Sequence, residues 1–244
     1  MKEMNSFWQQ LYAQSQQVDL DNMPVEHMQL NHDLAVDAAI SLRQSPWLPS
    51  PAKGIKRLLL EREGGEKTLR ATSIVAYQPN SQFASHTHPM GEEFFVLAGT
   101  FSDQYGDYPT GSYVRNPPGS SHKPFSRDGC LIWVKLQQFA PNDSQHVVLS
   151  SGQQAANIDD RLCNRRILFN DYEKVELLKA NQDFVIDPAW SKQGIEILVL
   201  QGQISSHKSQ FNDGHWLRLA ASNSRVLTVK KSSQLLIKYQ HLEL

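Results

Sequence analysis

Short apolar runs dominate the chain from about residue 36 onward, and they alternate with polar, turn-forming residues. Examples are "TSIVAY", "EFFVLAG" and "LIWVKLQQF", which are separated by Gly, Pro, Asn and Ser. This pattern predicts an all-β sandwich or barrel. The chain before these runs differs, because "NSFWQQLYAQSQQ" places apolar residues at helical spacing. We expect one short amphipathic helix there, which packs on the body of the protein or, alternatively, docks on a partner subunit.

The second half of the chain repeats the first at a constant offset of 103 residues. "GSYVR" at 111–115 aligns with "GHWLR" at 214–218, and "IWVKLQ" at 132–137 aligns with "LLIKYQ" at 235–240. A single offset keeps each matched side chain on the same face of its strand, which favours two copies of one β domain. We expect an N-terminal segment followed by these two domains, at residues 1–35, 36–143 and 144–244.

The composition excludes several classes of protein. The chain has 24 basic and 25 acidic residues and no basic cluster that would follow a phosphate backbone, so we expect no nucleic-acid partner. No signal peptide and no apolar run of about 18 residues occurs, which predicts a cytoplasmic protein that does not interact with a membrane. The two cysteines, Cys130 and Cys163, are too few for a disulfide scaffold, and we expect both as reduced thiols in the core.

The stretch "SHTHPMGEEFF" carries the strongest candidate chemistry. Side chains alternate between the two faces of a strand, so His86, His88 and Glu92 share one face if "PMG" bends without a change of register. A Pro-Pro-Gly turn before His122 would bring this side chain back toward the other three. Three imidazoles and one carboxylate suit Zn(II), Fe(II), Mn(II) or Ni(II) better than Ca(II) or Mg(II). We therefore expect one divalent transition metal per chain, with four ligands: His86, His88, Glu92 and His122.

The internal repeat distinguishes the two adjacent acids, Glu92 and Glu93. Glu93 aligns with another acid, Glu196, whereas Glu92 aligns with Ile195. The three histidines are also absent from the second copy, where they align with Ala189, Ser191 and Arg225. An acid that disappears together with the histidines is expected to bind the metal, and an acid that stays is expected to have a structural role, such as a bond to Arg115. The second copy is therefore expected to be metal-free.

These residues resemble the two signature motifs of the cupin superfamily, G(x)5HxH(x)3-4E(x)6G and G(x)5PxG(x)2H(x)3N. Here the motifs extend from "HTHPMGE" to Gly99 and from Gly111 to "PPGSSH", with Asn80 near the place of the first glycine and Ser126 at the place of the last asparagine. Residues 70–139 resemble, more specifically, the cupin domain of ChrR-type anti-sigma factors and of related proteins similar to acetylacetone dioxygenases. The resemblance implies two tandem jelly-roll (RmlC-like) barrels after the short helix, with the metal held at the same four residues.

Three functions are compatible with this resemblance. One is a mononuclear metal dioxygenase or related oxidoreductase that acts on a small carbonyl or enolisable compound. Another is a non-catalytic zinc-binding sensor that responds to oxidants or a small ligand and signals to a regulatory protein partner. The third is a barrel that the metal stabilises. Residues before position 40 contain no cysteine, so the HxxxCxxC zinc-binding anti-sigma segment of full ChrR proteins has no counterpart there.

Two further expectations concern the surroundings of the site. No catalytic base distinct from the ligands is identified from the sequence. Exposed edge strands in cupins predict a homodimer. Aromatic residues near the motif are expected to line a pocket for a substrate or other small ligand: Phe94, Tyr105, Tyr113 and Trp133.

Overall fold

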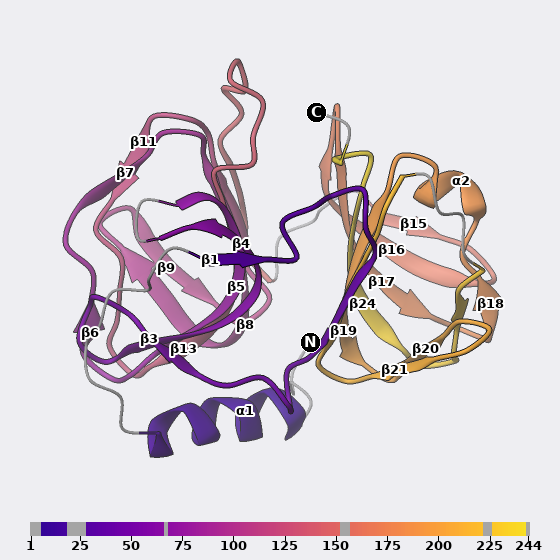
Figure 1. Cartoon of the computed structure of the whole chain (residues 1–244), viewed down its shortest axis with the longest axis horizontal. Helices are drawn as coiled ribbons and strands as arrows, with labels where there is room; N and C mark the ends of the chain where they lie inside the picture. Colours follow the sequence, from indigo (N-terminus) through magenta and orange to yellow (C-terminus); the bar gives the residue numbers. More distant parts are fainter. Residues whose placement is uncertain (1–5, 19–27, 66–67, 152–156, 222–225, 243–244) are drawn as a thin grey trace. The chain divides into compact units, whose positions relative to one another are not determined.

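A computed structural model of the chain describes residues 6–18, 28–65, 68–151, 157–221 and 226–242. It divides into two compact units (Figure 1). Each unit has its own hydrophobic core. Both units are built from antiparallel strands, so the predicted all-β class is confirmed. The first unit consists of Met1–His32 and Ser45–Gln153, and the second of Asp33–Gln44 and Gln154–Leu244.

The first unit is a curved sheet around an apolar core. Its main strands lie in the order β1 (Met28–Leu30), β4 (Ile55–Gly64), β5 (Thr68–Tyr77), β13 (Cys130–Leu136), β8 (Glu92–Asp103), β10 (Tyr113–Asn116) and β14 (Val147–Leu149). Four short strands pair beside them: β3 (Leu48–Pro49), β6 (Ser81–Gln82), β9 (Gly106–Pro109) and β12 (Phe125–Ser126). A separate ribbon contains β7 (His86–His88) and β11 (Ser120–His122). Alternate residues of β13, Cys130, Ile132 and Val134, belong to the core, as the two-residue period of a strand requires.

Helix α1 (Ser6–Gln17) packs on the first unit, which agrees with its predicted amphipathic pattern. Its side chains Phe7, Trp8 and Leu11 are buried, and the helix contacts β8 and β13. Each of these large apolar side chains contributes roughly 1.5–3 kcal/mol when it is removed from water. The other helix among the described residues is α2 (Pro188–Ser191), and neither helix is long and apolar enough to cross a membrane.

The second unit repeats this arrangement in shorter form. Its main sheet has the order β15 (Asn157–Asp159), β16 (Cys163–Asn170), β17 (Lys174–Ala180), β24 (Gln234–Tyr239), β19 (Ile195–Gln201), β22 (His215–Leu219) and β2 (Ala38–Ser41). A smaller sheet contains β18 (Phe184–Val185), β23 (Thr228–Val229), β20 (Gln203–Ser205) and β21 (Gln210–Asn212). An apolar core fills the space that these strands enclose.

Strand pairing repeats between the two units at the offset seen in the sequence. Glu93 of β8 lies opposite Lys135 of β13, and Glu196 of β19 lies opposite Lys238 of β24. Each of these strand pairs also contains one β-bulge, at the aligned position. The agreement of register and bulge confirms that the chain contains two copies of one fold.

The course of the chain differs from the boundaries expected at 36–143 and 144–244. Strand β2 lies where the first domain was expected to begin, but it pairs with β22 in the second unit, with Ala39 opposite Leu217. In the first unit, β14 occupies the corresponding edge beside β10, so this unit continues to Gln153. An edge strand exposes unpaired backbone groups, and a strand from a distant part of the chain satisfies those of β22. Local sequence patterns do not reveal such a pairing.

Candidate metal centre

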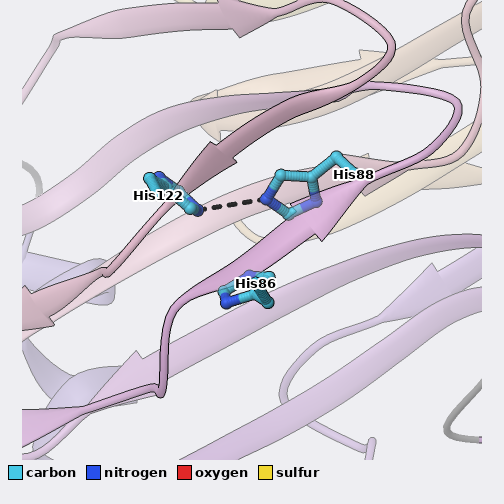
Figure 2. A group of neighbouring side chains, drawn as sticks. All are labelled: His86, His88 and His122. Carbon is cyan, nitrogen blue, oxygen red and sulfur yellow. Dashed lines mark hydrogen bonds between the residues drawn. The ribbon is translucent and has the colours of Figure 1, made fainter.

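Three imidazole rings gather on the ribbon of β7 and β11 (Figure 2). His86 and His88 share one face of β7, and His122 lies opposite His86 in the antiparallel register. Before β11 the chain turns at Gly119, whose φ of +81° favours glycine and whose amide donates to the His88 carbonyl at 2.9 Å. The candidate ligand nitrogens of the three histidines all lie within 4.8 Å of one another.

Glu92 joins these histidines from the start of β8. The chain bends just before it at Gly91, which has a φ of +78° and donates its amide to the His88 carbonyl at 3.2 Å. Oε2 of Glu92 lies 3.6 Å from Nε2 of His88 and 3.4 Å from Nε2 of His122. The Asn116 amide donates to the same oxygen at 3.1 Å. The structure therefore brings together all four residues that the sequence predicted as ligands.

The separations of three of these donor atoms, those of His88, His122 and Glu92, fit an ion of transition-metal size. Nε2 of His88 and Nε2 of His122 are 3.1 Å apart, and the Glu92 oxygen is 3.4 and 3.6 Å from them. Metal bonds of about 2.0–2.2 Å place neighbouring ligand atoms roughly 2.8–3.6 Å apart at octahedral or tetrahedral angles. A set of imidazole nitrogens with one carboxylate is also the donor chemistry that Zn(II), Fe(II), Mn(II) and Ni(II) accept. The residues present thus fit a divalent transition metal.

Two of the rings are held by contacts on the side away from the cluster. Nδ1 of His122 lies 3.2 Å from Oδ2 of Asp103, and Asp103 accepts a hydrogen bond from the Tyr108 hydroxyl at 3.1 Å. Nδ1 of His86 lies 2.8 Å from the carbonyl oxygen of Ala84. A proton on each Nδ1 would complete these hydrogen bonds and leave Nε2 available as a ligand, an arrangement common among metal-binding histidines. Asp103 was not predicted from the sequence, because it stands at the far end of β8 from the motif.

The charges of the site favour a bound cation. Burial alone would raise the pKa of Glu92, but the neighbouring imidazoles of His88 and His122 outweigh burial and lower it. Burial is the main cause that lowers the pKa of His88. Burial also opposes a charge on His122, but Glu92 and Asp103 outweigh it and raise the pKa of this ring above its ordinary value. A divalent cation would take the place of the proton that these two carboxylates attract.

Glu93 has the structural surroundings expected of it. The Tyr113 hydroxyl donates to its Oε2 at 2.6 Å, and Nη1 of Arg115 lies 3.7 Å from the same oxygen. Its counterpart Glu196 accepts a hydrogen bond from Nε1 of Trp216 at 2.7 Å. Both acids are buried beside large side chains on the outer face of their sheets. These contacts explain an acid at this position in both copies.

The aligned positions of the second unit provide no comparable donor set. Ile195, which stands in place of Glu92, belongs to the hydrophobic core. Ala189 and Ser191 lie in α2, and Arg225 lies outside the described residues. In the part of the chain that the structure describes, the histidine cluster of the first unit is the one group of three or more His, Cys, Asp or Glu residues suited to a metal.

A cavity of about 640 Å³ opens beside the cluster. His86, His88 and Glu92 form part of its wall. Much of the remaining wall comes from inward-facing residues of β4, β5 and β13 and from the segment before β7: Arg57, Arg62, Val75, Tyr77, Phe83 and Leu136. A volume of this size is typical of sites for small molecules. Three of the four candidate ligands are therefore accessible to a small molecule.

The wall contains none of the aromatic residues that the sequence predicted for the pocket: Phe94, Tyr105, Tyr113 and Trp133. Phe94 packs in the core, where its ring centroid is 4.6 Å from that of Phe101, and Tyr105 is 72% exposed. The other two lie on strand faces directed away from the core, since their neighbours Val114 and Val134 belong to it. The prediction was wrong because it used closeness to the motif in sequence, whereas curvature of the sheet brings β4 and β5 to the site.

The match to known proteins agrees with this architecture. Residues 35–140 match the family described as the ChrR Cupin-like domain. Comparison with curated protein sequences gives no match. Among solved structures, YlbA from Escherichia coli shares 13% identity at a TM-score of 0.64, over 85% of this chain and 91% of YlbA.

Two further crystal structures share the fold. The pirin YhhW from Escherichia coli, solved in complex with nickel(II), has 11% identity and a TM-score of 0.61, over 84% of this chain and 98% of YhhW. A protein of Nostoc punctiforme described as a candidate dioxygenase has 16% identity and a TM-score of 0.61, over 91% of this chain and 85% of its own. Residues 35–140 therefore match the ChrR cupin-like domain, and the chain shares the fold of these solved structures.

Proposed function

We propose that the first barrel binds one divalent transition metal and catalyses a dioxygenase-type oxidoreduction of a small enolisable carbonyl compound. The proposed ligands are His86, His88, Glu92 and His122. The observation that carries the proposal is the cavity of about 640 Å³, whose wall includes three of these four side chains. An ion with a purely structural role needs no such opening. The nickel(II) complex of the pirin neighbour and the candidate dioxygenase neighbour support the same chemistry.

The metal would supply Lewis acidity, which lowers the pKa of an enol, and a redox centre for dioxygen. The protein would orient the metal ligands and exclude water from the site. Asp103 fixes the ring of His122, and Asn116 holds the carboxylate of Glu92. The apolar walls formed by Tyr77 and Phe83 would keep water from the reacting carbonyl compound. In a dioxygenase both oxygen atoms enter the substrate, which provides the four electrons, so no separate reductant is needed.

Metal content and oxygen uptake test this proposal. The purified protein should contain about one metal per chain by elemental analysis, and the His122→Ala variant should contain much less. After anaerobic loading with Fe(II), oxygen uptake should depend on an added enolisable dicarbonyl such as 2,4-pentanedione. His241 lies in the second unit, so His241→Ala is a matched control that should keep the metal. Equal metal content in His122→Ala and the wild type would contradict the ligand assignment.

A different outcome would support the zinc-binding sensor instead. One zinc per chain, no substrate-dependent oxygen uptake, and partner binding that changes with peroxide would identify a regulatory module. The two cysteines do not favour thiol-based sensing, because both are buried and unpaired. Burial raises the pKa of Cys130 to about 12 and that of Cys163 to about 11, so little reactive thiolate forms.

A further inference from the structure

Tyr77 of β5 is the one tyrosine in the described wall of the cavity that contains the candidate metal ligands. Its ring lies among other aromatic rings, with its centroid 6.0 Å from that of Phe83 and 5.4 Å from that of Phe101. The Phe83 ring is in turn 5.8 Å from the His86 ring, and the Phe101 ring is 6.1 Å from the His122 ring. A single aromatic ring therefore separates Tyr77 from each of two candidate ligands.

The hydroxyl of Tyr77 makes no hydrogen bond within the part of the chain that the structure describes. The residue is only 3% exposed, yet this oxygen is not one of the fully buried side-chain atoms that lack a partner. Because Tyr77 lines the cavity, its hydroxyl is reached from there. Burial is the main cause that raises the pKa of Tyr77 well above its ordinary value, so the hydroxyl keeps its proton and can donate it in a hydrogen bond.

Other buried tyrosines differ from Tyr77, because the protein itself provides the partners of their hydroxyls. Three of these hydroxyls each donate to a buried carboxylate, at distances of 2.6–3.1 Å: those of Tyr108, Tyr113 and Tyr239. A buried tyrosine hydroxyl usually finds such a partner, since a lost hydrogen bond costs about 1–3 kcal/mol. For Tyr77 the acceptor has to be a molecule inside the cavity, either water or a bound ligand.

The repeat shows that the fold does not require a tyrosine at this position. Ala180 of β17 aligns with Tyr77 at the offset of 103 residues, and both side chains belong to the hydrophobic cores of their units. The hydroxyl is therefore present in the copy that contains the histidines and absent from the other. Glu92 shows the same difference, since it aligns with Ile195. This parallel associates Tyr77 with the chemistry of the site.

The wall next to Tyr77 is apolar. Val75 lies two residues earlier on the same face of β5, and Ile132 lies opposite Val75 on β13. Phe83 contacts the Tyr77 ring from the segment before β7. Apolar surface that is removed from water contributes roughly 25 cal/mol per Å² to binding. A ligand that places an apolar group here would therefore be held beside the one hydroxyl that is ready to donate.

We propose that the cavity binds a small carbonyl compound with an apolar substituent, and that the Tyr77 hydroxyl donates a hydrogen bond to its carbonyl oxygen. The apolar substituent lies against Val75, Phe83 and Ile132, and the hydrogen bond sets the orientation of the carbonyl group in the cavity. That the bound compound is then oxidised at the metal rests on the function proposed above. Recognition of the carbonyl group by Tyr77 does not depend on the metal.

Binding of two probes of the same shape tests this inference. Acetophenone and α-methylstyrene differ by the replacement of C=O with C=CH₂, so only the first can accept the hydrogen bond. Ligand-observed NMR titrations of the metal-free, full-length protein measure both dissociation constants without turnover. Tyr77→Phe should raise the Kd of acetophenone about 3- to 10-fold, because it removes one neutral hydrogen bond. The same variant should not raise the Kd of α-methylstyrene.

Two further measurements separate this role from a structural one. Because the Tyr77 hydroxyl has no partner in the described protein, Tyr77→Phe should not lower the Tm of the ligand-free protein, and a lower Tm would contradict the inference. The infrared carbonyl stretch of ¹³C-labelled acetophenone should lie at lower frequency in the wild-type complex than in an aprotic solvent. Tyr105→Phe is the matched control, since Tyr105 is 72% exposed and lies outside the described wall. If Tyr77→Phe does not fold, the carbonyl stretch in the wild type decides.

The inference is overturned if Tyr77→Phe changes the Kd of both probes alike, or if it leaves the Kd of acetophenone unchanged. It is also overturned if the wild type binds no acetophenone up to the solubility limit. A protein without metal, or without substrate-dependent oxygen uptake, would refute the proposed function only. The effect of Tyr77→Phe on acetophenone would then still be expected in the metal-free protein.

Discussion

Two adjacent glutamates at the start of β8 should respond in opposite ways to the same substitution. Glu92→Gln removes the carboxylate that lies 3.4 Å from Nε2 of His122. Glu93→Gln removes a carboxylate that is buried against Tyr113 and Arg115. Glutamine keeps the size of the side chain and one acceptor oxygen, but it loses the charge and replaces the second acceptor with a donor. The pair of variants therefore separates metal binding from folding.

The expected size of each effect follows from the contacts. Removing one partner of a buried ion pair costs about 3–5 kcal/mol. The cost of removing the Glu93 charge should be smaller, because Arg115 also pairs with Asp143 at 2.5 Å and so keeps one carboxylate partner. We therefore expect Glu93→Gln to lower the free energy of unfolding by about 2–3 kcal/mol. For a domain of this size, the Tm should fall by about 4–12 °C. Metal affinity should stay close to that of the wild type.

Glu92→Gln should show the reverse. Loss of a residue that hydrogen-bonds to a metal ligand lowers metal affinity about 10- to 100-fold. Loss of the ligand itself should therefore lower the affinity by at least about 100-fold. At a pH well above the raised pKa of His122, where the imidazoles are neutral, the Tm of the metal-free variant should change by less than about 4 °C, since about 1 kcal/mol of hydrogen bonding from Asn116 is altered.

Metal competition against a chelator and differential scanning calorimetry, each with and without zinc, measure both quantities. Tyr113→Phe is the control for Glu93→Gln, because it removes the hydroxyl donor without a change in charge and should cost about 1 kcal/mol. Wild-type zinc affinity in Glu92→Gln would refute the assignment of this ligand. Loss of zinc in Glu93→Gln at an unchanged metal-free Tm would show that the wrong glutamate was chosen.

Three further outcomes are expected. Asp103→Asn should weaken zinc binding about 10- to 100-fold, measured by chelator competition, because it disturbs the contact that orients His122; unchanged affinity would exclude this role. The raised pKa of His122 stabilises the metal-free fold below the ordinary histidine pKa, and this contribution is lost as the pH rises through the raised value. Zinc binding should therefore release more protons at about pH 6 than at about pH 9, measured by calorimetry in buffers of different ionisation enthalpy, and equal release would contradict it. Gly91→Ala should lower stability by at least about 1–2 kcal/mol in chemical denaturation, because φ is +78° and an added Cβ would lie 2.3 Å from the ring of Phe139; a neutral effect would show that the turn relaxes.

Some features of the site were predictable and others were not. The ligand set followed from strand periodicity and from the repeat, because both depend on which face a side chain occupies. The arginines of the cavity could not be found in this way. A bulge in β4 shifts the register between Leu59 and Glu61, so that Arg62, and not Glu61, shares the face of Arg57. A strict two-residue period would have placed the acid in the cavity.

The sequence by itself determined the all-β class, the two copies of one domain, and the four candidate ligands in the first copy. These features follow from local alternation, turn residues and a constant offset, which survive any arrangement of the strands in space. Only the tertiary structure decided which residues line the cavity, that Asp103 supports His122, and that β2 completes the sheet of the second unit. Each of these depends on sheet curvature, bulges or pairing between distant strands, and such contacts leave no periodic signal along the chain.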